Sequence, residues 1–234
     1  WTNLCNHACV YCGPEFSSRW SAELGVSLPT PSVEQQTQFK EYILQHAHRL
    51  RHVYLAGGEP LLIKENVALL NQLYQLKPDI ELRINTNLSV INNEIYQLIQ
   101  KFKNVHWTVS VETIGDEFEY IRYPAKAESV FANVDAYRKF FNGHSNVRLE
   151  ITVTVSTLNV ANIDRIEHNL RQRFQLPVLP NFVTEPRGYD IRNIPNKDQL
   201  LIKNSVVRRF LTQPATDADA YAQYVLHSQQ LDHI

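Results

Sequence analysis

Residues 105–111 read Val-His-Trp-Thr-Val-Ser-Val, so apolar side chains occupy every odd position and polar side chains every even one. Side chains of a β-strand point alternately to opposite faces of a sheet, and this period of two predicts a strand with one apolar and one polar face. Two further segments show the same alternation. Their polar positions, together with those of the first segment, are Glu81, Arg83, Asn85, Asn87, His106, Thr108, Ser110, Glu112, Arg148, Glu150, Thr152 and Thr154.

Strands and helices alternate along the chain. Short strand-like segments at 53–55, 80–86, 105–111, 147–155 and 178–184 are separated by segments with helical periodicity. Repeated strand–helix units predict a parallel sheet with right-handed crossovers. Because helices must cover the apolar face, the polar face is left to water or to a ligand. We therefore expect an α/β fold, a partial (β/α)6 barrel of parallel strands with helices outside; a two-layer sheet with one solvated face is the alternative.

The segment before the first strand carries a helix start signal. Ser32 and Gln35 have the S-x-x-Q spacing of a capping box. The helix that follows is expected to turn Phe39, Tyr42 and Ile43 towards the core. We expect residues 1–190 to form the barrel domain, with a metal-binding loop at 5–12, and residues 191–234 to form a C-terminal helical extension.

Composition narrows the classes of function. The 234 residues are 44% hydrophobic and carry a net charge of −1, and charges of both signs are interspersed. The absence of a basic patch predicts no nucleic-acid partner. No apolar run approaches the ~18 residues of a membrane span, so no membrane association is expected. An odd number of cysteines, three within eight residues, predicts a metal site in a reducing compartment and hence a cytoplasmic protein.

The cysteines have the pattern C-x3-C-x2-C, formed by Cys5, Cys9 and Cys12. Three thiolates on one short loop can hold three corners of a cubane iron–sulfur cluster, which leaves the fourth iron open to a small molecule. The alternative is a structural zinc site with His7 as the fourth ligand. Structural zinc sites normally take their ligands from two separated pairs, which this crowded loop does not offer.

This cysteine pattern, with Tyr11 before the last cysteine and Asn6 after the first, resembles the signature of the radical S-adenosylmethionine (SAM) superfamily. The tetrapeptide Gly57-Gly58-Glu59-Pro60, directly after the first strand, resembles the GGEP motif of the same superfamily. The segments 85–87, 120–123 and 186–195 are similar to the subset called twitch-domain radical SAM proteins. The additional cysteines that bind an auxiliary cluster in that subset are absent from this sequence.

The resemblance implies a reaction. A 4Fe–4S cluster would reductively cleave SAM to a 5′-deoxyadenosyl radical, which abstracts hydrogen from a substrate. A peptide or protein is the expected substrate, a small molecule remains open, and a flavodoxin or ferredoxin is the expected electron donor. A different hypothesis is a non-catalytic, zinc-stabilised α/β binding module.

The resemblance also implies roles for residues. Cys5, Cys9 and Cys12 would ligate the cluster. The other expected cofactor contacts fall into four groups. They are the GGEP residues Gly57, Gly58, Glu59 and Pro60 at the SAM amino group, Tyr11 near the adenine, Ser110 and Glu112 at the ribose and methionine carboxylate, and Asn85, Asn87, Thr154 and Asn181 along the cavity. Arg122 would either pair with the SAM carboxylate or form a surface ion pair on a helix.

Overall fold

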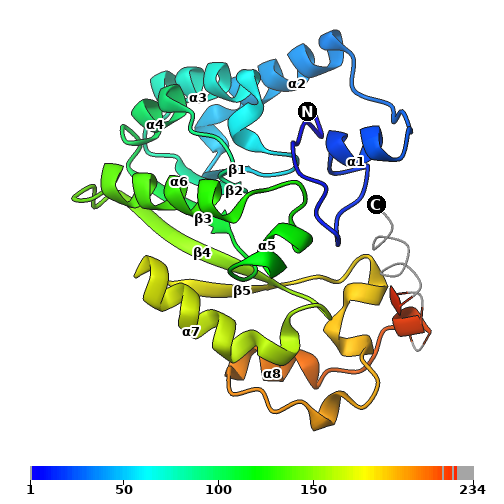
Figure 1. The fold of residues 1–234 in the computed structure, drawn as a ribbon. Coiled ribbons are helices and arrows are strands. Elements are labelled where there is room, and N and C mark those ends of the chain that lie inside the picture. The colour runs from blue at the N-terminus through cyan, green and yellow to red at the C-terminus, as the bar shows by residue number, and fades with distance from the viewer. Residues whose placement is uncertain (1, 218, 223, 226–234) are drawn as a thin grey trace.

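A computed structural model describes residues 2–217, 219–222, 224 and 225 (Figure 1). The described residues form one parallel sheet in the order β1-β2-β3-β4-β5. Its strands are β1 (His52–Leu55), β2 (Glu81–Thr86), β3 (Asn104–Ser110), β4 (Val147–Val155) and β5 (Val178–Phe182). The expected α/β fold is confirmed, with five strands in the described residues where the full partial barrel would have six.

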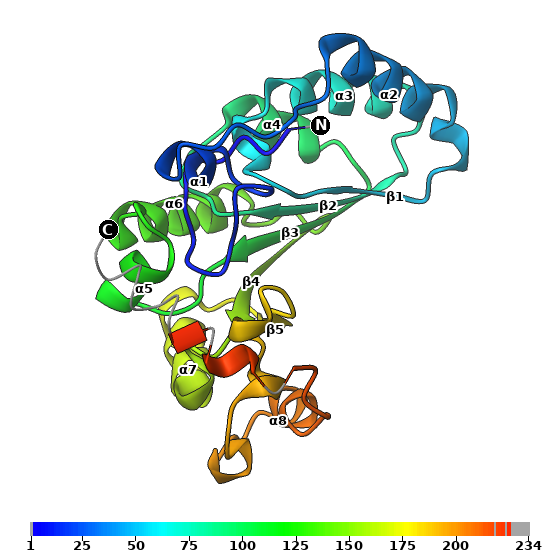
Figure 2. The same cartoon turned by 90° about the vertical axis from the view of Figure 1, so that its right-hand side faces the viewer.

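Helices follow the strands as the alternating pattern predicts. The helices are α1 (Ser18–Glu23), α2 (Val33–Gln45), α3 (Lys64–Leu76), α4 (Asn93–Ile99), α5 (Asp116–Ile121), α6 (Ala127–Phe140), α7 (Ile163–Phe174) and α8 (Ser205–Leu211). Helices α3, α4 and α6 cover one face of the sheet, and the N-terminal segment lies at one end of the strands (Figure 1 and Figure 2). No described helix has the length and apolar character needed to cross a membrane.

The apolar face of the sheet forms the core. Leu82, Ile84, Val105, Trp107 and Val109 are all buried and belong to one cluster with the inner faces of the helices. This arrangement confirms the predicted phase of β2 and β3. Burial of these side chains supplies the main driving force for folding, at roughly 25 cal/mol for each Å² of apolar surface removed from water.

The polar face of the sheet is concave and open. The parallel register places Tyr54 beside Arg83, Arg83 beside His106 and Asn85 beside Thr108. A cleft of ≈ 480 Å³ lies over these strands. Its lining residues are His52, Tyr54, Arg83, Asn85, His106, Thr108, Glu150, Thr152, Leu179, Pro180 and Asn181. Six of the twelve predicted polar positions, Arg83, Asn85, His106, Thr108, Glu150 and Thr152, therefore border a cavity.

The first long helix departs from the sequence prediction. Ser32 and Gln35 form the predicted capping box at the start of α2. However, α2 contains no fully buried residue, and Phe39 and Tyr42 are exposed to 53% and 61%. The helix ends at Gln45, and its apolar stripe is too narrow to bring both the aromatic residues and Ile43 against the core.

The predicted C-terminal extension packs on the same core as the barrel. Ile191, Ile202, Val207 and Leu211 are buried in the main apolar cluster. In the described residues this region holds α8 and short 3-10 turns, including Ile191–Asn193 and Lys197–Gln199. Residues 226–234 of the predicted extension lie outside the described residues.

Candidate functional site

The cysteine loop is fixed to the rest of the molecule from two sides. On one side, the backbone N–H groups of Ala8 and Val10 donate to the carbonyl oxygens of Tyr123 and Ile121, at 2.6 and 3.0 Å. On the other side, the Ser17 hydroxyl donates to the carbonyl of His7 at 2.6 Å. The Trp20 indole N–H donates to the carbonyl of Cys9 at 2.9 Å. These bonds hold a short irregular segment in one conformation.

The three thiols lie near one another within this loop. The pKa of Cys9 is raised to about 12, mainly by burial; the Arg122 charge acts in the opposite direction, and Glu112, Cys12 and Cys5 make smaller contributions that also raise this pKa. Burial likewise raises the pKa values of Cys5 and Cys12. Such groups become thiolates only when a metal ion compensates the buried charge, which fits a site built for metal ligation.

The predicted metal ligands do not form a ready-made metal site in the described residues. Within them, no group of three or more His, Cys, Asp or Glu side chains is arranged to hold a metal ion. Neither the three cysteines alone nor the same cysteines with His7 form such a group. The His7 ring is buried, burial lowers the pKa of His7 to about 3, and its Nδ1 has no hydrogen-bond partner among the described residues. The donor set, three thiols on one loop, fits an iron–sulfur cluster with an open iron.

The two glycines after β1 bring the GGEP segment against the start of the chain. Gly57 and Gly58 have φ values of +83° and +56°, which side chains disfavour. A Cβ at Gly58 would lie 2.3 Å from the carbonyl oxygen of Leu4. The backbone N–H of Glu59 also donates to that oxygen, at 2.7 Å. The chain segment that precedes Cys5 therefore packs directly against Gly58. From the sequence, a ligand, the SAM amino group, was expected to approach at this position.

The Glu59 carboxylate is buried and points back into the protein. Its Oε1 accepts from the Leu61 N–H at 3.1 Å and from the Thr86 hydroxyl at 2.5 Å. Its Oε2 accepts from the Asn87 N–H at 2.7 Å. Burial raises the pKa of Glu59, although these hydrogen bonds act in the opposite direction. Glu59 thus joins the GGEP turn to the end of β2.

Asn87 extends this connection to the cysteine loop. Its Nδ2 donates to the Oδ1 of Asn6 at 3.2 Å and lies 3.8 Å from the Sγ of Cys5. Its Oδ1 accepts from the N–H of Ser89 at 2.9 Å. An amide donor beside a thiolate stabilises the negative charge on sulfur, and hydrogen bonds of this kind tune iron–sulfur clusters. The sequence placed Asn87 along the cavity; the structure places it against a cysteine.

Glu112 and Arg122 form a buried ion pair beneath the loop. Arg122 donates from Nη2 to Oε1 of Glu112 at 2.6 Å and also from Nε to Oε2. The Tyr11 hydroxyl donates to the same Oε1 at 2.7 Å. Burial alone raises the pKa of Glu112, but the Arg122 charge and hydrogen bonds from Arg122, Tyr11 and Thr154 outweigh burial and lower it.

This ion pair corrects one prediction and refines another. Arg122 is only 5% exposed, so the surface ion pair considered for it is wrong. Glu112 and Ser110 lie on the side of the sheet that faces the cysteine loop, because Glu112 bonds Tyr11 and the Ser110 hydroxyl donates to Asn85 at 3.2 Å. The sequence did not indicate that Glu112 and Arg122 pair with each other, although a Glu and an Arg ten residues apart around a short helix were visible.

Two of the three remaining predicted cavity residues line the cleft. Asn85 and Asn181 both border it, from β2 and β5. Thr154 is the register neighbour of Asn181 and bonds Glu112. The structure therefore brings together two groups of predicted residues: one around the cysteine loop, and one along the cleft.

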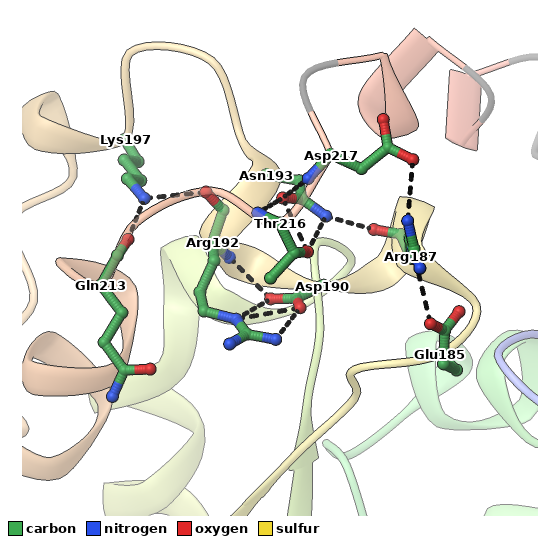
Figure 3. A network of polar contacts seen from close by, with 9 residues as sticks. All are labelled: Glu185, Arg187, Asp190, Arg192, Asn193, Lys197, Gln213, Thr216 and Asp217. Carbon is green, nitrogen blue, oxygen red and sulfur yellow. Dashed lines mark hydrogen bonds and ion pairs between the residues drawn. The ribbon is translucent and has the colours of Figure 1, made fainter.

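The C-terminal part of the chain is joined to the turn 187–193 by a network of polar contacts (Figure 3). The side chain of Asn193 donates to the carbonyl of Arg187 at 2.9 Å and accepts from the N–H of Thr216 at 2.8 Å. Arg187 in turn lies 3.5 Å from Asp217. These contacts hold the segment 213–217 beside the turn 187–193.

The same turn contributes to a small apolar cluster under the cysteine loop. Tyr189 packs with Val10, Ile121 and Val183, and the Tyr224 ring lies 5.3 Å from the Tyr189 ring. The C-terminal segment thereby covers the apolar side of the loop. Sequence reasoning missed this role, because contacts between segments almost 200 residues apart leave no local pattern.

A thiol-bearing loop at the carboxyl ends of parallel strands, beside a GGEP turn and a polar cleft, is the arrangement of a radical SAM domain. The family model described as Radical SAM superfamily matches residues 1–169. The chain belongs to the radical SAM superfamily, whose cofactors are SAM and a 4Fe–4S cluster.

Among characterised proteins, the relatives are enzymes named GTP 3′,8-cyclase. The one from Campylobacter lari is 26% identical over 120 residues, which cover 51% of this chain and 35% of that protein. The one from Sulfurimonas denitrificans is 25% identical over 134 residues, covering 57% of this chain and 38% of that protein. The matches thus span little more than a third of the length of these relatives.

Solved structures share the fold. Streptococcus suis SuiB bound to the precursor peptide SuiA has a TM-score of 0.59 at 15% identity, over 98% of this chain and 45% of that one. Native anSMEcpe with bound AdoMet has a TM-score of 0.56 at 15% identity, over 76% of this chain and 50% of that one. These values establish a common architecture.

Proposed function

We propose that the chain is the catalytic core of a radical SAM enzyme that cleaves SAM reductively. When bound, the reduced 4Fe–4S cluster supplies one electron to SAM, which yields a 5′-deoxyadenosyl radical able to abstract hydrogen from a substrate. The observation that carries the proposal is the position of the Cys5–Cys12 loop. It is hydrogen-bonded to the end of α5 and to Tyr123 just after it, and it contacts Asn87 after β2, directly beside the GGEP turn.

The residues of the chain have separable tasks in this proposal. Cys5, Cys9 and Cys12 hold the cluster, and the Asn87 amide stabilises the Cys5 thiolate. The backbone at Gly57 and Gly58 binds the SAM amino group, since the Glu59 carboxylate is already engaged by three donors. Glu112 and Arg122 position Tyr11, so that its ring can pack beside the adenine.

The other expected cofactor contacts are assigned roles from their positions in the structure. Ser110 and Asn85 bond each other on the polar face just below the loop and are proposed to meet the SAM ribose. Thr154 and Asn181, adjacent on β4 and β5, extend this surface into the cleft. The cleft excludes bulk water from one side of the bound substrate, which protects a reactive radical.

The substrate is proposed to be a peptide or protein, as expected from the sequence. The shared fold with SuiB, crystallised with its precursor peptide, agrees with this proposal. A small-molecule substrate is the second candidate, because the relatives named GTP 3′,8-cyclase are more similar in sequence. We also propose that the protein belongs to the twitch-domain subset and is cytoplasmic. Its proposed electron donor is a flavodoxin or ferredoxin.

Metal analysis separates this proposal from a zinc-stabilised binding module. Protein purified and reconstituted without oxygen should contain about four irons and four sulfides per chain, with broad absorbance near ~400 nm. Replacing Cys5, Cys9 or Cys12 by Ala should abolish iron binding, and His7→Ala should retain it. One zinc per chain with no iron, lost in His7→Ala, would establish the zinc module instead.

A further inference from the structure

One part of the cleft lies away from the cysteine loop. His106 and Ser110 are both on β3, and their separation of four residues corresponds to roughly 13 Å along a strand. Ser110 is near the loop, whereas His106 lines the cleft together with Arg83, Tyr54 and His52. This group, Arg83 with Tyr54, His52 and His106, is called the basic wall below.

The basic wall presents hydrogen-bond donors to the cleft. Arg83 and His106 are register neighbours on adjacent strands, and Tyr54 is the neighbour of Arg83 on its other side. A guanidinium offers five N–H donors, two imidazoles offer at least two more, and the phenol offers another. The side chain of Arg83 is 53% exposed, so it can reach a ligand without leaving the sheet.

Glu81 engages one donor of Arg83 and leaves the others available. The Nε of Arg83 donates to Glu81 at 2.7 Å. Within the described part of the chain, the other guanidinium N–H groups have no recorded hydrogen bond. The Glu81 carboxylate also lies 4.0 Å from the Nε2 of His106, so among the described residues it is the one acid that competes with a ligand for the basic wall. The acid that lines the cleft, Glu150, is buried and bonded to Arg148 at 2.9 Å. The available polar groups of the basic wall therefore favour a negatively charged ligand.

We propose that the basic wall binds an oxyanion of the substrate, either a carboxylate or a phosphate. Arginine recognises both groups through paired N–H donors, which fix orientation as well as position. Across the cleft from the basic wall, Leu179 and Pro180 of the edge strand β5 offer an apolar surface to the carbon skeleton of the same ligand. An oxyanion anchored here would leave the rest of the substrate to extend towards the cysteine loop. The inference rests on the proposed function in one respect, that the ligand is the substrate of this enzyme.

Calorimetric titration of the reconstituted protein tests the proposal. The probes are inorganic triphosphate and a pentaglutamate peptide, each at low ionic strength because salt screens exposed charges. Arg83→Gln should weaken binding by roughly 10- to 100-fold through the loss of charged hydrogen bonds. Glu81→Gln, which removes the competing carboxylate, should strengthen binding. Arg165→Gln removes an exposed arginine outside the cleft and should leave binding unchanged.

Each outcome decides between supporting and overturning the proposal. Binding of triphosphate alone assigns a phosphate, and binding of pentaglutamate alone assigns a carboxylate. The proposal is overturned if neither probe binds, if Arg165→Gln weakens binding as much as Arg83→Gln, or if Glu81→Gln weakens it. The opposite signs expected for Arg83→Gln and Glu81→Gln separate a specific site from general damage to the fold.

The failure of this inference is distinguishable from the failure of the proposed function. Wild-type protein that forms 5′-deoxyadenosine from SAM but binds neither probe refutes the oxyanion site alone. Wild-type protein that binds a probe at Arg83 but never cleaves SAM refutes the proposed function alone.

Discussion

Replacing Glu112 by Gln should destabilise the protein strongly. The side chains of Glu112 and Arg122 are 0% and 6% exposed, and two hydrogen bonds join them. The substitution leaves the Arg122 guanidinium buried without a counter-charge, which costs about 3–5 kcal/mol. Whole domains are stable by only about 5–15 kcal/mol, so this is a large fraction of the free energy of unfolding.

The assay is urea-induced unfolding followed by circular dichroism, with every variant in the same state of metal loading. The matched control is Glu23→Gln, which breaks the pair of the exposed Glu23 with Arg19, 2.6 Å apart and one helical turn apart on α1. An exposed pair of this spacing is worth about 0.3–0.5 kcal/mol. The double variant Glu112→Leu with Arg122→Met removes both charges and should recover most of the lost stability. A loss in Glu112→Gln as small as in the control would refute the buried ion pair.

Three further outcomes are expected. Gly58→Val should lower both stability and iron content, because the new side chain displaces Leu4. Gly57→Ala places its Cβ with no atom within 4 Å, so it should lower stability only. Equal iron content in the two variants would contradict this expectation. The pKa of Glu112 is lowered in the folded state, so its stabilising effect is present above the usual glutamate pKa and is lost as pH falls through the lower, folded-state pKa. Unfolding titrations of the wild type should therefore show an acid loss that Glu112→Gln lacks, and superimposable pH profiles would count against the pair. Tyr137→Phe removes a buried hydroxyl without a partner among the described residues, so its melting should show equal or greater stability, by up to about 1 kcal/mol; a loss above about 1 kcal/mol would indicate a hidden partner.

The fold could be predicted from the sequence because it depends on the local periodicity of apolar and polar residues. The alternation along 105–111 places Trp107 in the core and His106 in the cleft, and both positions are confirmed. The same phase holds in β2, where Leu82 is buried and Arg83 is exposed. Period-two and helical patterns are properties of single segments, so they need no knowledge of distant contacts.

The details of the site depend on contacts between distant segments and were harder to predict. Tyr11 and Arg122 lie on different loops, and only the folded chain shows that both bond Glu112. The packing of Gly58 against Leu4 likewise depends on how the first residues return to the end of β1. The prediction that α2 turns Phe39 towards the core was wrong because helical spacing alone does not show how much of a helix face the rest of the fold covers.

The formation of 5′-deoxyadenosine tests the central claim most directly. Anaerobically reconstituted protein is mixed with SAM and dithionite, and the products are separated by chromatography and identified by mass. The account predicts 5′-deoxyadenosine and methionine in equal amounts from the wild type, and neither above background from Cys9→Ala at matched protein concentration. Fully reconstituted wild-type protein that binds four irons and SAM yet yields no more 5′-deoxyadenosine than Cys9→Ala would contradict it.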